Sequence, residues 1–405
     1  MLDLTLLPKD YRAKLREAER RILKAKSNGK DVIVIHHDDA DGLSSAAITS
    51  ETLRRLNVEH RLVCIEKLLD EIIEHIHSQE NRLIIYCDIG SPHADEIAQV
   101  DNGKNDVIIL DHHDPQVTEA ENVLDLNLEL FNFKGETDFS GATCCYIFSK
   151  AISPENIDLS YLAIVGSHEL PGGFREFNLA ALEDALENNI VSEKNGSYLI
   201  KKLRITTKRL FSILQVLGSV GYYKGGPEMG VKVALNGLDD EAKKMHDTLE
   251  AIRKQRNRML LSRLFRGQLK KLRYVQWFNA GNIYEGLGVK TIGTFCSFIS
   301  YIKRLVDENK YIVGFQPLPP RIPGLDVKLK KSYYKVSMRA PVKLREKIEE
   351  GKMPTVIEVL KYAGRGIGTA IDGHAFAASG IIEADKISLF IFKVEEYVEK
   401  FLGGQ

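Results

Sequence analysis

The sequence predicts an α/β protein in which a parallel-sheet domain is joined by a long helix to a smaller α/β domain. In the first 110 residues, short apolar strands alternate with helical segments, a pattern typical of right-handed crossovers in a parallel sheet. A long charged stretch with no Pro and no Gly follows between Leu238 and Gly267. Beyond Tyr274, short strands with glycine-rich turns return.

The elements of the first domain follow from the spacing of its apolar residues. Strands are expected at 31–35, 60–65, 83–87 and 107–110. Their nearly continuous apolar runs indicate a sheet covered on both faces. Helices are expected at 8–28, 43–56, 67–78, 92–99, 140–151 and 158–170. Residues 181–220 are expected to be mainly helical, and 221–230 carry turn signals.

These elements predict that the chain is divided into three parts. The first domain is expected at 1–236, the connector helix at 237–272 and the second domain at 273–405. A chain of 405 residues is long enough for a packed core in each domain.

The composition places the protein among soluble enzymes. Its formal net charge is zero, whereas a protein that coats nucleic acid would be strongly basic. The five cysteines form no CxxC pair, so neither a disulfide framework nor a zinc site is indicated. Neither a membrane span nor a signal peptide is recognisable, and we expect a cytoplasmic protein without a membrane partner.

Three of the expected strands run directly into acidic and histidine residues. In an open α/β sheet, ligands bind outside the carboxyl ends of the strands, so we expect these residues to converge in one crevice. After the first strand they alternate, and alternate residues of an extended segment point the same way. The candidate metal ligands are His37, Asp39 and Asp41 after the first strand, Asp88 after the third, and Asp111, His112 and His113 after the fourth.

These residue types indicate a centre for divalent metal ions. Several carboxylates in one crevice repel one another unless cations lie between them. Imidazole and carboxylate ligands without a thiolate favour manganese or a similar ion over structural zinc. Two bridged ions would lower the pKa of a bound water and hold a phosphate oxygen, which is the chemistry of phosphoester hydrolysis. Aspartates that only cap helices are the structural alternative, but three clusters at successive strand ends favour the metal site.

The patterns HxDxDG, DxG and DHH at these strand ends resemble motifs I, II and III of the DHH phosphoesterase superfamily. That superfamily includes RecJ exonucleases, their archaeal relatives, oligoribonucleases, cyclic-dinucleotide phosphodiesterases and family II pyrophosphatases. The resemblance implies that His37 and Asp39 hold one ion, that Asp41 and His112 hold the other, and that Asp88 bridges them. It also implies catalytic roles for Asp111, at or near the metal, and for His113, at the scissile phosphate. His36 and Asp38 are interpreted as structural.

One expected ligand departs from the family pattern. The family usually places an aspartate near the end of the next helix, and residues 163–170 contain none. His168 or Glu169 is expected to replace it, unless neither reaches the metals and the second ion site is weak.

The C-terminal residues resemble the DHHA1 domain of the same superfamily. Residues 371–380 are similar to its GGHxxAAG signature, with Asp372 and Ser379 as departures, and residues 336–339 are similar to its SxR strand. The resemblance implies that Arg339 contacts phosphate with support from Ser337. The expected nucleic-acid-binding residues are Ser337, Arg339, Arg365, Gly373 and His374. Ordinary turns and a surface arginine are the structural alternative.

The resemblance favours an exonuclease for single-stranded DNA or RNA in replication or repair, of the archaeal RecJ-like type. We expect two Mn²⁺ ions, with Mg²⁺ or Co²⁺ as substitutes, and the compact chain favours 3′→5′ digestion. A repair helicase or a replisome component is the expected partner, and homo-oligomers fit equally. The alternatives are a phosphodiesterase for oligoribonucleotides or cyclic dinucleotides, and a non-catalytic replisome scaffold.

Overall fold

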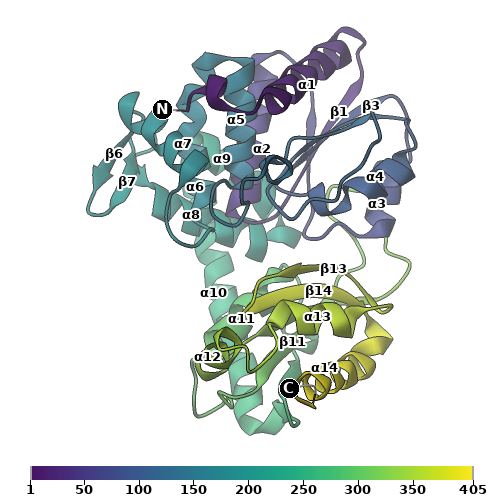
Figure 1. Cartoon of the computed structure of the whole chain (residues 1–405). Coiled ribbons are helices and arrows are strands. Elements are labelled where there is room, and N and C mark those ends of the chain that lie inside the picture. Colours follow the sequence, from purple (N-terminus) through teal and green to yellow (C-terminus); the bar gives the residue numbers. More distant parts are fainter. Residues whose placement is uncertain (1, 404–405) are drawn as a thin grey trace. The chain divides into compact units, whose positions relative to one another are not determined.

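The computed structural model describes residues 2–403. The chain forms two compact units, one reaching to Asp247 and including Pro323–Leu325, the other comprising Thr248–Ile322 and the residues from Asp326 onward. The divide falls inside helix α10 (Asp240–Arg263). Each unit has a sheet of its own (Figure 1).

The N-terminal unit is built on a five-stranded sheet in the order β2-β1-β3-β4-β5, and all of its pairings are parallel. The strands are β1 (Asp31–His36), β2 (Arg61–Cys64), β3 (Arg82–Cys87), β4 (Asp106–Leu110) and β5 (Val123–Asp125). The four predicted strands are confirmed, and β5 is an additional strand. The central strands β1, β3 and β4 are almost wholly buried, as their continuous apolar runs predicted.

Helices surround this sheet (Figure 1). They are α1 (Lys9–Ser27), α2 (Ala40–Arg55), α3 (Asp70–Ile76), α4 (Ala94–Asp101), α5 (Gly141–Ile152), α6 (Ser160–Ser167), α7 (Glu176–Glu187), α8 (Thr207–Gln215) and α9 (Gly226–Asn236). Helix α2 packs against α5 and α6, and the three are buried on most of their surface. Helix α2 begins at Ala40, shortly after β1 ends at His36.

The expectation of mainly helical structure over 181–220 is wrong for its middle. Strands β6 (Val191–Lys194), β7 (Ser197–Ile200) and β8 (Ile205–Thr206) form a small antiparallel sheet there. Asn195 and Gly196, with φ of 50° and 69°, form the tight turn between β6 and β7. An Asn-Gly pair is a strong hairpin signal, and it was available in the sequence. The turn signals at 221–230 also end earlier than expected, because α9 begins at Gly226.

The connector is shorter than the expected 237–272. Helix α10 ends at Arg263, and Gly267 has φ of 91°, a left-handed conformation that a glycine adopts without strain and that ends the helical path. Lys270 and Lys271 already form strand β9, paired with β10 (Val275–Asn279).

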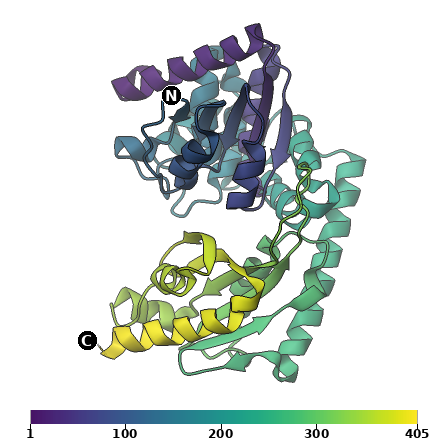
Figure 2. The ribbon, with the colours of Figure 1, turned by 90° about the vertical axis from the view of Figure 1, so that its right-hand side faces the viewer.

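The C-terminal unit has a mixed six-stranded sheet in the order β13-β14-β12-β11-β10-β9. Its remaining strands are β11 (Tyr311–Leu318), β12 (Tyr333–Arg339), β13 (Gly368–Gly373) and β14 (Ala377–Glu383), and its helices are α11 (Lys290–Ile299), α12 (Val342–Glu349), α13 (Val356–Gly364) and α14 (Ile387–Gly403). Figure 2 shows α14, in yellow, lying along this sheet. Its buried residues Phe390 and Val394 join Phe315 and Val336 in one core. Among the described residues, no helix combines the length and the apolar character that crossing a membrane requires.

Candidate metal centre

The three predicted motifs begin at the same edge of the N-terminal sheet. Strands β1, β3 and β4 are neighbours, and the register pairs His36 with Cys87 and Cys87 with Leu110. Each of these residues is the last of its strand. The strands therefore end level, and the residues that follow them lie side by side.

The side chains after these strands gather around Asp88. His37 Nδ1 lies 2.9 Å from Asp39 Oδ2 and 3.6 Å from Asp88 Oδ2. On the other side, His112 Nε2 lies 3.4 Å from Asp88 Oδ1 and 3.7 Å from Asp41 Oδ2. The two oxygens of Asp88 thus face two different imidazoles, each accompanied by a second carboxylate. A bridging carboxylate between two cation sites has this arrangement.

The polar atoms of this cluster fit a metal. Asp88 Oδ1 is buried and makes no hydrogen bond among the described residues, and the buried His37 Nδ1 has only carboxylate oxygens beside it. Two sets of three residues each offer ligand atoms that all lie within 4.8 Å of one another. One set is His37, Asp39 and Asp88, and the other is Asp88, His112 and His113. Burial, followed by the charges of neighbouring aspartates, raises the pKa of Asp88 well above its usual value. Cations between these carboxylates would remove that penalty.

Each imidazole has a polar group facing its other ring nitrogen, as is usual for metal-binding histidines. His112 Nδ1 lies 2.8 Å from the carbonyl oxygen of Gly135, which leaves Nε2 directed at the carboxylates. His37 Nε2 lies 3.3 Å from Asp38 Oδ1. Asp38 is completely buried. From the alternation of side chains along an extended segment, Asp38 was expected to point to the opposite face as a structural residue. That alternation does not show the contact between Asp38 and the adjacent His37.

Asp111 lies behind the cluster and holds His113. Its Oδ1 is 2.7 Å from His113 Nδ1 and accepts the backbone N–H of His112, while Oδ2 accepts that of Ser91. Burial opposes ionisation of Asp111, but His113 and these donors outweigh it and hold the pKa of this carboxyl below its usual range. The side chain of His113 is 36% exposed, so His113 can meet a substrate while Asp111 positions it.

Helices α5 and α6 come close to the carboxylates because two of their residues lack a side chain. A Cβ on Gly141 would lie 2.3 Å from Asp88 Oδ1, and one on Gly166 would lie 2.1 Å from Asp41 Oδ1. The backbone N–H groups of Gly141 and Ala142 donate to Asp41 at 2.9 and 2.8 Å. Asp88 has φ of 58°, in the left-handed region, which directs its side chain toward α5.

The two candidates for the missing aspartate, His168 and Glu169, have different surroundings. His168 lies between Phe174 and Phe211, and its Nε2 is 2.9 Å from the hydroxyl of Thr207. Burial and Lys208 lower the pKa of His168 to about 4. The charge of Glu169, by contrast, is one of those that raise the pKa of Asp88, after burial and three aspartates. Glu169 Oε2 accepts a hydrogen bond from Gln215 Nε2 at 3.3 Å.

The predicted substrate-binding residues of the C-terminal unit are only partly brought together. Arg339 Nε donates to Ser297 Oγ at 2.9 Å and Nη1 donates to the Ala378 carbonyl at 3.1 Å, beside the buried Ser337. The turn that contains Gly373 is closed by a bond from the backbone N–H of His374 to the Ala377 carbonyl at 2.8 Å. Arg365 lies at the end of α13, with its guanidinium 5.6 Å from the ring centroid of Tyr362.

The two departures from the DHHA1 signature contact each other. Ser379 Oγ donates to Asp372 Oδ1 at 2.9 Å, and Lys335 Nζ donates to Ser379 Oγ at 2.7 Å. Lys335 is 2% exposed, so this chain holds a buried ammonium group in the sheet. The replacements at 372 and 379 thus provide polar partners for a lysine that the sequence interpretation did not single out for this role.

Residues 31–165 match the family described as DHH family, N-terminal domain. An uncharacterised protein of Methanocaldococcus jannaschii is 36% identical over 140 residues, which are 33% of this chain and 31% of that protein. The chain therefore matches less than a third of the length of this curated relative.

Solved structures share the fold over nearly the whole chain. RecJ from Thermus thermophilus in complex with Mn²⁺ has a TM-score of 0.64 at 18% identity, over 98% of this chain and 56% of that chain. The same protein has also been solved with Mg²⁺. CDC45 from Entamoeba histolytica has a TM-score of 0.53 at 9% identity, over 95% of this chain and 98% of that chain. Residues 31–165 thus match the N-terminal domain of the DHH family, and the chain has a RecJ-like fold.

Proposed function

We propose that this protein is a metal-dependent exonuclease that shortens single-stranded DNA or RNA in replication or repair. The observation that carries the proposal is the division of the Asp88 carboxylate between His37 and His112, at 3.6 and 3.4 Å. Two adjacent cation sites that share one carboxylate are suited to phosphoester hydrolysis.

The residues present can hold two divalent ions, for which Mn²⁺ is the first candidate and Mg²⁺ or Co²⁺ the substitutes. His37 and Asp39 would hold the first ion, Asp41 and His112 the second, and Asp88 both. Glu169 is the proposed fourth ligand of the second site. When bound, such ions supply an activated water and neutralise charge on the phosphate.

The protein's own groups around the ions would position the phosphate and move a proton. His113 is the exposed imidazole of the cluster, and its Nδ1 contacts Asp111 at 2.7 Å. That contact fixes the ring and leaves Nε2 to face the substrate, where it would hydrogen-bond to a phosphate oxygen or give a proton to the leaving oxygen. Arg339, supported by Ser337, is the proposed contact of the C-terminal unit with the strand, together with His374, Gly373 and Arg365.

Two alternatives differ in substrate or in activity. A phosphodiesterase for oligoribonucleotides or cyclic dinucleotides would use the same metal centre. A non-catalytic scaffold is the second alternative, because the fold likeness extends to CDC45 over 95% of this chain. The intact cluster of His37, Asp88 and His112 favours an enzyme over the scaffold.

The test is manganese-dependent digestion of matched single-stranded DNA and RNA, labelled in turn at each end. A ladder of shortened products is expected, and the label that persists gives the direction, for which we propose 3′→5′. Asp88→Asn is the matched control, because it removes the bridging charge with little change of shape. Manganese binding without cleavage of either strand would contradict an exonuclease. Cleavage of cyclic dinucleotides in its place would support the first alternative.

A further inference from the structure

One surface of the C-terminal unit presents aromatic rings next to cations. Phe298 and Tyr301, three residues apart at the end of α11, are 51% and 62% exposed. Arg345 of α12 has its guanidinium 6.0 Å from the centroid of the Tyr301 ring and 5.9 Å from that of Phe376. Its Nε donates to the Ala340 carbonyl at 2.8 Å, which restrains the guanidinium near both rings. We name Phe298, Tyr301 and Arg345 the aromatic shelf.

The shelf continues into a charged pocket of the same unit. The pocket has a volume of about 410 Å³, and its lining residues are Lys303, Glu308, Asn309, Val342, Lys343, Glu346, Lys347, Glu350 and Lys352. Lys303 follows Tyr301 by two residues, and Val342 and Lys343 share the first turn of α12 with Arg345. Shelf and pocket are therefore built from the same two chain segments.

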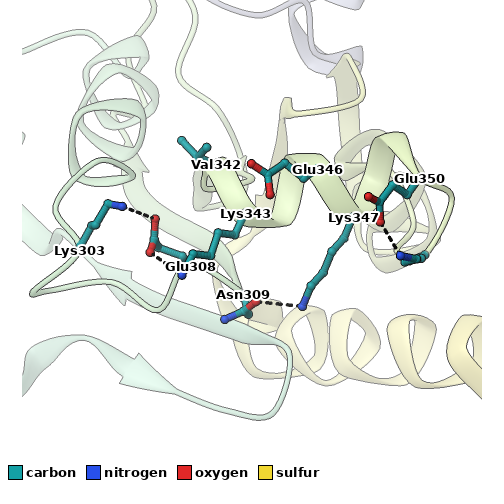
Figure 3. A pocket seen from close by; sticks show the side chains of 9 residues that line it. Lys303, Glu308, Asn309, Val342, Lys343, Glu346, Lys347 and Glu350 are labelled. Atoms are coloured by element: carbon teal, nitrogen blue, oxygen red, sulfur yellow. Dashed lines mark hydrogen bonds and ion pairs between the residues drawn. The ribbon is translucent and has the colours of Figure 1, made fainter.

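The pocket has more positive than negative groups. Figure 3 shows Lys303 and Lys343 converging on one carboxylate, that of Glu308, at 3.4 and 3.3 Å. Lys347 donates to the side-chain oxygen of Asn309, an uncharged acceptor, at 2.9 Å. Four lysines face three glutamates in the lining, and Arg345 adds a further cation beside it. The surface is suited to an anion that can displace weak ion pairs at the protein surface.

Rings and cations on one surface match the two parts of a single-stranded nucleic acid. Unpaired bases stack on exposed aromatic side chains, and lysines and arginines follow the phosphates. Exposed aromatic residues are also frequent in protein interfaces, but lysine is depleted there, and this surface carries several. The charge therefore favours a polyanion over an apolar protein segment.

We propose that the aromatic shelf and the lysine pocket bind a stretch of single-stranded nucleic acid other than the one being hydrolysed. The proposal rests on the proposed nuclease function, since it names a second contact with the same strand. It adds Phe298, Tyr301 and Lys347 to the residues that hold the substrate. Strands long enough to occupy the shelf and the pocket together should bind more tightly than short ones.

The experiment compares affinities for labelled single strands of about 4 and about 20 nucleotides, measured by fluorescence anisotropy in Ca²⁺ to suppress cleavage. The double variant Phe298→Ala/Tyr301→Ala is expected to bind the long strand about tenfold more weakly, the loss typical of one or two stacked bases, with a much smaller change for the short strand. Phe392→Ala is the matched control, since Phe392 of α14 is equally exposed, at 63%. Lys347→Gln should reduce the slope of log Kd against log salt concentration by about one unit.

The proposal is overturned if the double variant binds the long strand like the wild type, or if Phe392→Ala weakens binding equally. An unchanged affinity of the double variant would indicate that the aromatic shelf binds a protein partner and not nucleic acid. These results are distinguishable from a failure of the proposed function, in which the wild type would neither bind nor cut any strand. Circular dichroism of each variant confirms that the exposed substitutions preserve the fold.

Discussion

The metal centre of the N-terminal unit and the Arg339 face of the C-terminal unit are both polar regions at strand ends, but they satisfy their polar atoms differently. In the metal centre, Asp88 Oδ1 is buried without a hydrogen bond among the described residues, and His37 Nδ1 has only carboxylate oxygens beside it. In the C-terminal unit, Arg339 donates to Ser297 and to Ala378. The first region is unfavourable until cations arrive, whereas the second is stable alone. We therefore expect substitutions in the metal centre to have the larger effects on catalysis.

The largest expected effect comes from Asp88→Asn. Loss of the shared charge removes a ligand from both ion sites, so hydrolysis should fall by at least about 10³-fold. Manganese binding, followed by isothermal calorimetry, should weaken at both sites, while the circular dichroism spectrum stays that of the wild type. Substantial remaining turnover would refute a shared bridging role.

Gly166→Ala should have the next largest effect, although Gly166 carries no charge. The added Cβ would lie 2.1 Å from Asp41 Oδ1, so either the carboxylate or α6 must move. Manganese affinity of one site should fall about 10- to 100-fold, the range typical of changes just behind the ligands. If calorimetry still shows two sites of normal affinity, Asp41 is not a ligand.

Arg339→Lys tests the Arg339 face of the C-terminal unit. It keeps the charge but loses the forked geometry that holds Ser297 and Ala378. We expect KM for a single strand to rise about tenfold, with kcat and manganese affinity nearly unchanged. A fall in manganese affinity would show that Arg339 does not act on the substrate.

Glu169→Gln tests whether Glu169 or His168 replaces the missing aspartate ligand of the metal centre. If Glu169 completes the second ion site, its loss should lower the affinity for one of two manganese ions by about tenfold. His168→Gln should leave both affinities unchanged, because His168 is directed at Thr207. The opposite pattern would assign the site to His168.

The smallest expected effect is on the pH dependence of stability. The pKa of His168 is lowered from its usual value to about 4, mainly by burial, so the unfolded chain binds its proton more readily than the folded one. Stability from this histidine is present above a pH of about 6.5 and is lost as the pH falls toward 4. Over that window, denaturant titrations should show the wild type losing roughly 1–2 kcal/mol more than His168→Gln. Parallel curves would show that His168 titrates normally.

The N-terminal sheet and the metal centre could be predicted because one signal defines both. Buried parallel strands are continuous apolar runs, and the residue after each run lies at the ligand-binding edge. Asp88 and His112 were thus expected in one crevice because each follows a strand of the same sheet. The four predicted strands are confirmed, each within one or two residues of its expected bounds.

What could not be predicted depends on contacts between distant segments. The contact of Asp38 with His37, and the link from Lys335 through Ser379 to Asp372, are set by side-chain conformations and sheet register that no local pattern contains. The β6–β7 hairpin is different, since its Asn195-Gly196 turn was visible in the sequence. The small polar strands around it lack the apolar run that identified the others.

The left-handed backbone conformation of Asp88 restricts which amino acids can replace this residue during evolution. Aspartate and asparagine adopt a φ near 58° more readily than other residues with a side chain, and glycine does so without strain. Glutamate would keep the charge but would be disfavoured there. The position can therefore lose its carboxylate mainly through asparagine or glycine, and neither disturbs the fold. If the proposed hydrolysis depends on this carboxylate, one nucleotide substitution at this position would end it.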